Sequence, residues 1–211
     1  MKLHEDILNQ DQKELLGKLA FLSESDLFMG GGTALALQLG HRTSVDFDLY
    51  SKEKFDVESL KNLFLTKIPE ISVAGQHEDG TLQMRVLEVD VSVFYYPYKL
   101  ISELVQFYPV KLAAMRDIAA SKIAAVVQRA RRRDFFDIYY LSKELGFDEV
   151  LRCAFEKFPW YSDSQGIVTR ALTYFDEAEG DDEADRVRVF DRGVDWNTVK
   201  GYLEQEVKML S

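Results

Sequence analysis

Apolar residues recur at near-helical spacing over residues 5–24, and this pattern predicts an amphipathic helix. A short apolar run at residues 27–29 ends in three glycines, residues 30–32, which predicts a strand followed by a tight turn. Thr33 then stands at the N-cap position of a short apolar helix over residues 34–39.

Between residues 45 and 96 the spacing of apolar residues changes between the period of a strand and that of a helix. Residues 45–50 alternate as a strand would, and residues 57–65 have the spacing of a helix. Two more strands are predicted over residues 71–76 and 81–96, the second interrupted by a turn. The pair Asp79–Gly80 between them is typical of a hairpin turn.

The C-terminal half has a helical character. Residues 112–130 are rich in alanine and lack glycine and proline, and a second helix is predicted over residues 135–145. Residues 147–210 are expected to be mostly helical. The pattern therefore predicts an α+β protein, with an α/β core over residues 1–100 and a helical domain over residues 101–211.

The composition describes a folded globular protein. The chain has 211 residues, of which 46% are hydrophobic and 12% aromatic, and no apolar run reaches the length of a membrane span. Its one cysteine, Cys153, cannot form an internal disulfide or a cysteine-built zinc site. We therefore expect a cytoplasmic protein that does not contact a membrane.

The net charge of −10 works against a broad surface for nucleic acid. Residues 146–211 carry 15 acidic and 8 basic side chains, whereas the first part of the chain is nearly balanced. Within that first part, four arginines form a local basic cluster: Arg129, Arg131, Arg132 and Arg133. Any contact with a polyanion is expected near these arginines.

Two carboxylates follow the glycine turn. Asp46 and Asp48 are two residues apart, so on a strand both side chains leave the same face, with Phe47 and Leu49 on the other. A divalent cation relieves the repulsion between like charges held this close. The alternative interpretations are an isolated Asp-x-Asp pair, as is common in loops, and an ordinary helix-entry turn at the glycines.

Asp90 is the candidate for a third carboxylate, because it lies between two valines on a predicted strand. Glu88 shares its face and is the competing candidate. Three carboxylates on neighbouring strands can hold Mg²⁺ ions that bridge triphosphate oxygens, and the third aspartate is a candidate general base.

A second set of candidates lies in the predicted helices near the arginines. On one continuous helix, three cations would fall within about 40° of one another and form a stripe for phosphates: Lys122, Arg129 and Arg133. Asp137 would extend this stripe, although a turn near residues 131–134 would interrupt it. The alternatives are a helix end whose arginines pair with Asp134 and Asp137, and a solvated Lys122.

These motifs resemble a known family. Gly30-Gly-Gly-Thr-Ala-Leu-Ala-Leu, then His41-Arg-Thr-Ser, then Asp46-Phe-Asp-Leu is similar to the first motif of the AbiEii/AbiGii toxin family of nucleotidyltransferases. The later run Asp117…Lys122…Arg129…Arg133-Asp-Phe-Phe-Asp-Ile-Tyr-Tyr-Leu resembles the downstream motifs of that family. Together the two matches span residues 28–141.

The resemblance implies a polymerase-β-like nucleotidyltransferase core, a short mixed sheet flanked by helices, and then a helical domain that completes the nucleotide site. It implies Mg²⁺-dependent transfer of a nucleotidyl group from an NTP to an acceptor hydroxyl, on a tRNA 3′ end or a protein. It also implies a toxin of a prokaryotic toxin–antitoxin or phage-defence module, with a cognate antitoxin as partner.

Carried over by position, three residues of the turn would contact phosphates: Gly31, Gly32 and Thr33. Asp46 and Asp48 would bind metal, Lys122 would contact the triphosphate, and Asp137, or else Asp134, would complete the site. His41 could also contact nucleotide. The third carboxylate, Asp90, is not always used in this subgroup. A catalytically silent protein that binds nucleotide or a partner on the same fold is the alternative function.

Overall fold

The computed structural model describes residues 2–77, 80–182 and 186–210. The chain forms two compact units, and each is made of several segments. The first, the sheet unit, comprises Met1–Gln38, Ser44–Lys99 and Glu103–Ala114, and the second, the helical unit, comprises Leu39–Thr43, Leu100–Ser102 and Met115–Ser211. The domain boundary at residues 100 and 101 stays a prediction, because compactness alone does not show that either unit folds by itself.

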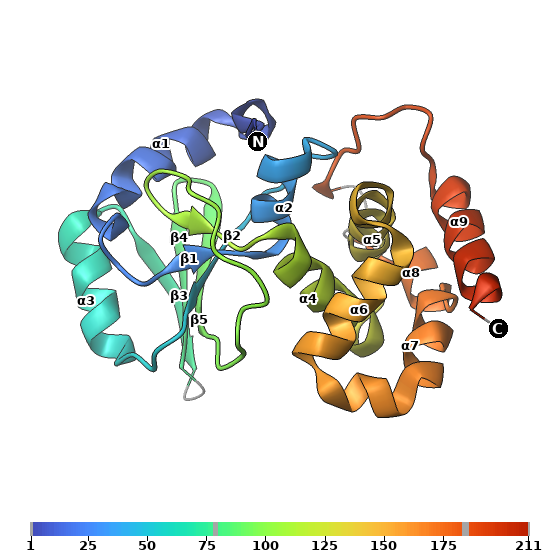
Figure 1. Ribbon diagram of the computed structural model, residues 1–211. Coiled ribbons are helices and arrows are strands. Elements are labelled where there is room, and N and C mark those ends of the chain that lie inside the picture. The colour runs from blue at the N-terminus through green and yellow to red at the C-terminus, as the bar shows by residue number, and fades with distance from the viewer. Residues whose placement is uncertain (1, 78–79, 183–185, 211) are drawn as a thin grey trace. The chain divides into compact units, whose positions relative to one another are not determined.

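The sheet unit contains a six-stranded mixed sheet in the order β3-β4-β5-β2-β1-β6 (Figure 1). β2 pairs in parallel with β5, β1 pairs in parallel with β6, and the other neighbours are antiparallel. The strands are β1 (Phe28–Met29), β2 (Phe47–Ser51), β3 (Ser72–His77), β4 (Thr81–Val86), β5 (Val89–Tyr95) and β6 (Lys111–Leu112). This mixed sheet with its helices confirms the predicted α+β class.

One face of this sheet is the core of the unit. Phe47 and Leu49 on β2 and Val91 on β5 are almost fully buried, as the alternating sequence predicts. Helices α1 (Gln10–Lys18) and α3 (Val57–Lys67) contact the sheet and lie on the same side of it (Figure 1). The opposite face therefore carries the alternate residues of β2 and β5, which are only half-buried.

The N-terminal helix is shorter than its apolar pattern predicts. Residues 5–24 form two 3₁₀ turns, η1 (Glu5–Ile7) and η2 (Leu19–Leu22), with α1 between them. Asn9 starts α1 with a capping box, in which its side chain accepts a hydrogen bond from Gln12 N (2.9 Å) and Gln12 Oε1 accepts one from Asn9 N (3.0 Å). The extended backbone of Asn9 keeps the preceding turn out of the helix.

The predicted break in the strand over residues 81–96 lies between β4 and β5, where Leu87 has a positive φ of 53°. Asp79 of the predicted hairpin turn lies outside the described residues. Gly80, which follows it, has a φ of 83°, a conformation that favours glycine.

The described part of the helical unit is mostly helical. Its helices are α4 (Met115–Gln128), α5 (Arg132–Leu145), α6 (Phe147–Lys157), η3 (Pro159–Ser164), α7 (Gln165–Leu172), α8 (Asp176–Glu179) and α9 (Trp196–Met209). α4 packs against α5, α6 and α7, so the alanine-rich segment is the centre of this unit. Inside it, Lys157 and the carboxylate of Asp117 form a buried ion pair.

The condition for the cationic stripe, one continuous helix, is not met, and two helices are present as the pattern over residues 112–130 and 135–145 predicts. α4 ends at Gln128 and α5 begins at Arg132, so Arg129 lies between two helices. The interruption is held by Asp181, whose carboxylate accepts hydrogen bonds from Arg131 Nη1 and from the backbone N of Arg132, each at 2.9 Å. The turn anticipated near residues 131–134 therefore begins two residues earlier.

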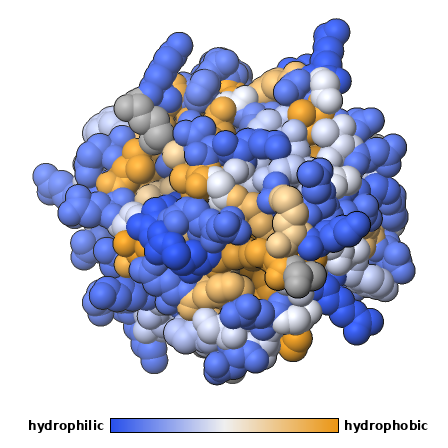
Figure 2. Space-filling model, turned by 45° about the vertical axis from the view of Figure 1, so that its right-hand side comes forward, coloured by the Kyte–Doolittle hydropathy of each residue, from blue (hydrophilic) through white to orange (hydrophobic). Residues whose placement is uncertain are grey.

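Hydrophilic side chains cover much of the surface in Figure 2, and apolar side chains gather in patches between them. In the part of the chain that the structure describes, no helix combines the length and the apolar character needed to cross a membrane.

Candidate active site

The glycine turn connects β1 to α2 (Gly31–Leu39) and lies against β2. Gly30 N donates a hydrogen bond to Asp48 O (2.9 Å), and a Cβ on Gly30 would lie 2.5 Å from the ring of Tyr50. Gly31 has a φ of 64°, and a Cβ there would overlap Oδ2 of Asp48. The absence of side chains at these two positions lets the carboxylate of Asp48 lie directly on the turn.

Thr33 has a different role from the N-cap that its position predicts. α2 already begins at Gly31, so Thr33 lies inside the first turn of the helix. Its side chain is 1% exposed, and its hydroxyl donates a hydrogen bond to the backbone carbonyl of Asp46. Thr33 therefore does not cap the helix, and its hydroxyl instead ties the first turn of α2 to the residue that precedes β2.

Asp48 lies on β2, and Asp46 directly precedes the strand, which begins at Phe47. Both residues are half-buried, whereas Phe47 and Leu49 between and after them are 0% exposed. Two adjacent carboxylates, one of them held against a glycine turn, are a donor set of hard oxygens that fits Mg²⁺. Their assignment as metal ligands stays a prediction.

Asp90 makes other contacts. On β5 it lies opposite Arg85 of β4, whose Nη1 donates a hydrogen bond to its Oδ1 (2.9 Å), and Arg85 Nη2 donates to Glu88 Oε2 (2.7 Å). Among the described residues, no group of three or more His, Cys, Asp or Glu side chains is arranged to hold a metal ion. For Asp90 or Glu88 to become a third metal ligand, its carboxylate would have to give up its hydrogen bond to Arg85 and bind the metal instead. The role of either residue as the third ligand stays a prediction.

The helical unit contains a buried cluster around Asp137, here called the Asp137 cluster. Its carboxylate receives a hydrogen bond from Arg42 Nε (2.7 Å) at Oδ1 and from Arg42 Nη2 (2.9 Å) at Oδ2. His41 Nε2 lies 2.8 Å from Oδ1, and Lys122 Nζ lies 2.7 Å from Oδ2. Lys122 Nζ also donates to Asp134 Oδ1 (2.6 Å). Lys122, His41 and both aspartates are thus buried together rather than solvated.

The electrostatics of this cluster favour charged Asp137 and Lys122 beside a neutral His41. Burial would raise the pKa of Asp137, but the charges and hydrogen bonds of Arg42 and Lys122 outweigh it and hold the pKa well below its usual range. Burial would lower the pKa of Lys122, but Asp134 and Asp137 outweigh it and raise the pKa. Burial lowers the pKa of His41 by more than its hydrogen bond to Asp137 raises it.

Arg42 is the member of this cluster that sequence reasoning missed. Its side chain is 1% exposed and follows α2 in the chain, in a segment with no helical or strand period. The tetrapeptide His41-Arg-Thr-Ser was a visible signal, but nothing local in it indicates a partner 95 residues away.

Two arginines of the basic cluster have described partners other than Asp134 and Asp137. Arg131 pairs with Asp181 (2.9 Å), and Arg132 contacts the ring of Trp196, 5.4 Å from its centroid. Arg129 is exposed at the end of α4 and Arg133 is half-buried in the first turn of α5. Nucleotide binding by Arg129 and Arg133 stays a prediction.

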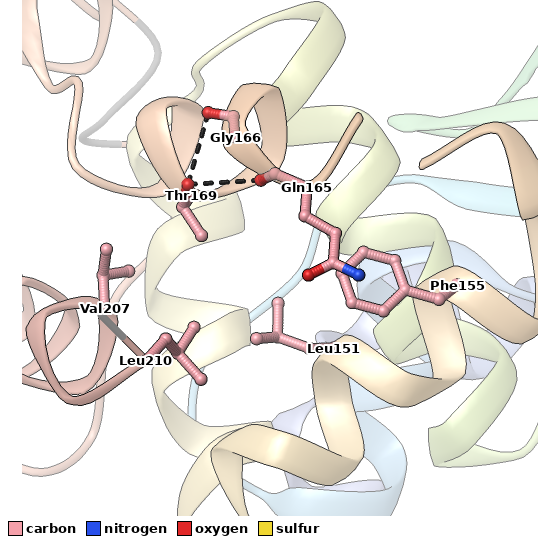
Figure 3. A pocket seen from close by; sticks show the side chains of 7 residues that line it. All are labelled: Leu151, Phe155, Gln165, Gly166, Thr169, Val207 and Leu210. Carbon is pink, nitrogen blue, oxygen red and sulfur yellow. Dashed lines mark hydrogen bonds between the residues drawn. The ribbon is translucent and has the colours of Figure 1, made fainter. Parts of the chain in front are cut away.

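A separate hollow of about 280 Å³ lies among α6, α7 and α9 of the helical unit (Figure 3). Its lining is mainly apolar, with Leu151 and Phe155 on one side and Val207 and Leu210 on another. The hydroxyl of Thr169 donates within its own helix, to Gln165 O and Gly166 O (each 3.2 Å). Since this lining carries no charged group, the hollow is not a candidate for transfer chemistry.

Comparison with known proteins gives the fold and the family. The profile of the family described as "Nucleotidyl transferase AbiEii toxin, Type IV TA system" matches residues 15–198. A protein of Aquifex aeolicus (strain VF5), "Uncharacterized protein aq_aa25", is 29% identical over 207 residues, which are 95% of this chain and 96% of that protein.

Two solved structures share the fold. MenT4, the nucleotidyltransferase toxin Rv2826c from Mycobacterium tuberculosis H37Rv, superposes with a TM-score of 0.63 at 17% identity, over 94% of this chain and 83% of that one. JHP933 from Helicobacter pylori superposes with a TM-score of 0.61 at 19% identity, over 99% and 93%. Because the family profile covers most of the sequence, from residue 15 to residue 198, this chain belongs to the AbiEii toxin family and is a nucleotidyltransferase.

Proposed function

We propose that this nucleotidyltransferase uses Mg²⁺ to move a nucleotidyl group from an NTP to an acceptor hydroxyl, and that it acts as the toxin of a prokaryotic toxin–antitoxin or phage-defence module. The acceptor is an RNA such as a tRNA 3′ end, or a protein. The observation that carries the proposal is the carboxylate of Asp48 lying against the Gly31 turn at the start of α2.

The turn suits the binding of phosphates. Gly31, Gly32 and Thr33 form the first turn of α2, where backbone N–H groups have no partner within the helix and the helix dipole favours negative charge. A side chain at Gly31 would occupy the place of the Asp48 carboxylate. The same turn therefore supports phosphate contact through its backbone and positions a carboxylate beside it.

Asp46 and Asp48 would hold the metal, with Asp90 as the candidate third ligand and general base. When bound, Mg²⁺ would neutralise the negative charge of the triphosphate. The buried face of β2, through Phe47 and Leu49, fixes the strand and hence the direction of the Asp48 carboxylate, and Asp46 directly precedes this strand.

Lys122 would contribute positive charge to the triphosphate site. Its pKa is raised by Asp134 and Asp137, so it stays protonated near neutral pH. To contact a phosphate, Lys122 would have to give up its ion pair with Asp134 or with Asp137. Asp137 would still be held by Arg42. Arg129 and Arg133 would add phosphate contacts.

The toxin role and a cytoplasmic location complete the proposal. The family description supports the toxin role, and the single cysteine is compatible with a reducing compartment. A cognate antitoxin is the expected partner. Induced expression should arrest growth of the host, and Asp48→Ala should abolish the arrest.

The direct test is transfer of label. The purified protein is incubated with Mg²⁺, total tRNA and each NTP labelled at the α-phosphate, and the products are separated on a denaturing gel. Label on RNA or on protein that disappears in Asp46→Ala and Asp48→Ala supports the proposal. Asp26→Asn is the matched control, because Asp26 is an exposed carboxylate of the same unit. Nucleotide binding without label on RNA or protein, for every NTP, supports the catalytically silent alternative.

A further inference from the structure

The face of the sheet that carries Asp48 continues into a row of aromatic rings. Tyr50 on β2 pairs with Phe94 on β5 and with Phe28 on β1, and Phe28 pairs with Lys111 on β6. Paired residues of neighbouring strands point to the same face of a sheet. These four side chains therefore form one line across four strands, and its three rings, Phe28, Tyr50 and Phe94, are here called the aromatic row.

The aromatic row is next to the carboxylate of Asp48. Asp48 lies two residues before Tyr50 on β2, and its strand partner Ser92 lies two residues before Phe94 on β5. Gly30, which directly follows β1 and whose N donates to the carbonyl of Asp48, lies two residues after Phe28. Two residues of a strand span about 7 Å. The ring of Tyr50 also lies against the backbone of Gly30. The glycine turn therefore contacts both the aromatic row, through Gly30, and the carboxylate of Asp48, through Gly31.

The rings form a continuous series that reaches solvent. Phe28 and Phe94 stack on the two sides of Tyr50, with centroids 5.7 Å and 5.5 Å away. Tyr96 meets Tyr50 edge-on at 5.2 Å, and Tyr98 meets Tyr96 at 5.3 Å. Phe28 is 1% exposed, Tyr50, Phe94 and Tyr96 are half-buried, and Tyr98 is 40% exposed. The series therefore runs from a buried ring to exposed ones, and Tyr96 and Tyr98 form its solvent end.

A cation accompanies the exposed rings, although the chain as a whole is acidic. At the β6 end of the line, exposed Lys111 lines a shallow hollow of about 300 Å³ together with Gln106 and Tyr108, whose side chain is 72% exposed. Exposed aromatic rings beside a cation are a combination that binds single-stranded nucleic acid.

We propose that the exposed rings at the end of this series, Tyr96 and Tyr98, together with Tyr108, stack the nucleobases at the 3′ end of a single-stranded RNA acceptor. Lys111 would contact its phosphates. The inference rests on the proposed function and makes its acceptor an RNA rather than a protein. The hydroxyl of a protein acceptor needs no stacking surface, whereas the last bases of an RNA must be held if its 3′ hydroxyl is to reach a metal at Asp48.

The experiment measures RNA binding without NTP, so that it does not depend on turnover. A fluorescently labelled single-stranded RNA with a free 3′ hydroxyl is titrated with wild type, Tyr98→Ala and Tyr98→Phe. Tyr98→Ala is expected to weaken binding by roughly 5-fold to 100-fold, the range for losing one stacked base. Tyr98→Phe keeps the ring and should bind as wild type does. Tyr174→Ala is the matched control, because Tyr174 is 48% exposed in the helical unit.

A second pair of measurements separates rings from charges. An RNA of equal length with abasic nucleotides at its 3′ end should bind wild type at least as weakly as the intact RNA binds Tyr98→Ala. Lys111→Gln should reduce the slope of log K against log salt by about 0.7. Equal binding of the intact and the abasic RNA would overturn the inference, as would equal binding by Tyr98→Ala and wild type.

Label transfer by the same variants distinguishes this inference from the proposed function. An increased KM for RNA in Tyr98→Ala with little change in kcat supports both. Transfer to RNA with an unchanged KM overturns the stacking role and leaves nucleotidyl transfer standing. Ring-dependent RNA binding without any transfer supports the stacking site and counts against the proposed function. Label on protein alone overturns the RNA acceptor.

Discussion

Arg42 holds the carboxylate of Asp137 with two hydrogen bonds, from Nε to Oδ1 at 2.7 Å and from Nη2 to Oδ2 at 2.9 Å. The side chains are 1% and 0% exposed. A two-pronged contact of this kind fixes the plane of a carboxylate as well as its position. Asp137 is therefore an anchored charge, and Lys122 meets it in a defined direction.

Asp137→Asn should strongly destabilise the protein. The substitution leaves the buried cations of Arg42 and Lys122 without their shared counter-charge, and breaking a buried pair in this way costs about 3–5 kcal/mol. Urea unfolding monitored by circular dichroism measures the loss. Asp163→Asn removes an exposed carboxylate and should change the free energy of unfolding by less than about 0.5 kcal/mol. Similar midpoints for the two variants would show that the cluster contributes little to stability.

The stability of the protein should fall as the pH drops below about 6.5. The pKa of His41 is lowered from 6.5 mainly by burial, so the unfolded state takes up a proton in this window before the folded state does. The contribution of neutral His41 is fully present above pH 6.5 and is lost as the pH falls through its lowered pKa. The contribution of ionised Asp137 to stability persists to lower pH, because the pKa of its carboxyl is held well below 3.8 in the folded state. This contribution is present above pH 3.8 and is lost as the pH falls through the lowered pKa.

The check is the urea midpoint of wild type and His41→Gln between about pH 5 and pH 8, the range in which histidine titrates. Glutamine keeps a donor for Asp137 but does not titrate, so the variant should lose the pH dependence that His41 causes. His4→Gln lies outside the Asp137 cluster and should keep it. A slope that is equal in wild type and His41→Gln would assign the dependence to another group.

The parts of the candidate site that the sequence predicts are those with a local cause. The carboxylates of Asp46 and Asp48 alternate with buried Phe47 and Leu49 because a strand has a period of two, and a six-residue window shows it. The resemblance in the motifs over residues 28–141 predicted the family that the profile match confirms.

The parts that it could not predict depend on distant residues. Arg42 and Asp137 are 95 positions apart, and neither has a neighbour that indicates the other. The sequence predicts a turn near residues 131–134, but not that it begins after Gln128 or that Asp181, about 50 residues further on, holds it. Gly30 and Gly31 also leave room for the ring of Tyr50 and the carboxylate of Asp48. This role is visible only in the folded chain, where β1 and β2 are paired.

Gly31→Ala should abolish activity and destabilise the protein. A φ of 64° costs a residue with a Cβ about 1–2 kcal/mol, and this Cβ would also displace the carboxylate of Asp48. Gly17→Ala is the matched control, because Gly17 lies in α1 with no atom within 4 Å of an added Cβ, and alanine there should stabilise by about 0.5–1 kcal/mol. Label transfer and thermal unfolding of the two variants test this, and an active Gly31→Ala would contradict the role given to the turn.

Thr33→Val should reduce activity more than Thr33→Ser does. The buried hydroxyl of Thr33 donates to the carbonyl of Asp46, so it joins the first turn of α2 to the residue that starts the carboxylate pair. Valine has nearly the same shape but leaves this carbonyl without its donor, at a cost of about 1–3 kcal/mol, whereas serine keeps the donor and loses only a methyl group. If the hydroxyl positions Asp46 for metal binding, Thr33→Val should also need more Mg²⁺ for half-maximal label transfer, and Thr33→Ser should not. An equal Mg²⁺ requirement in both variants, with reduced stability in Thr33→Val alone, would restrict Thr33 to a structural role.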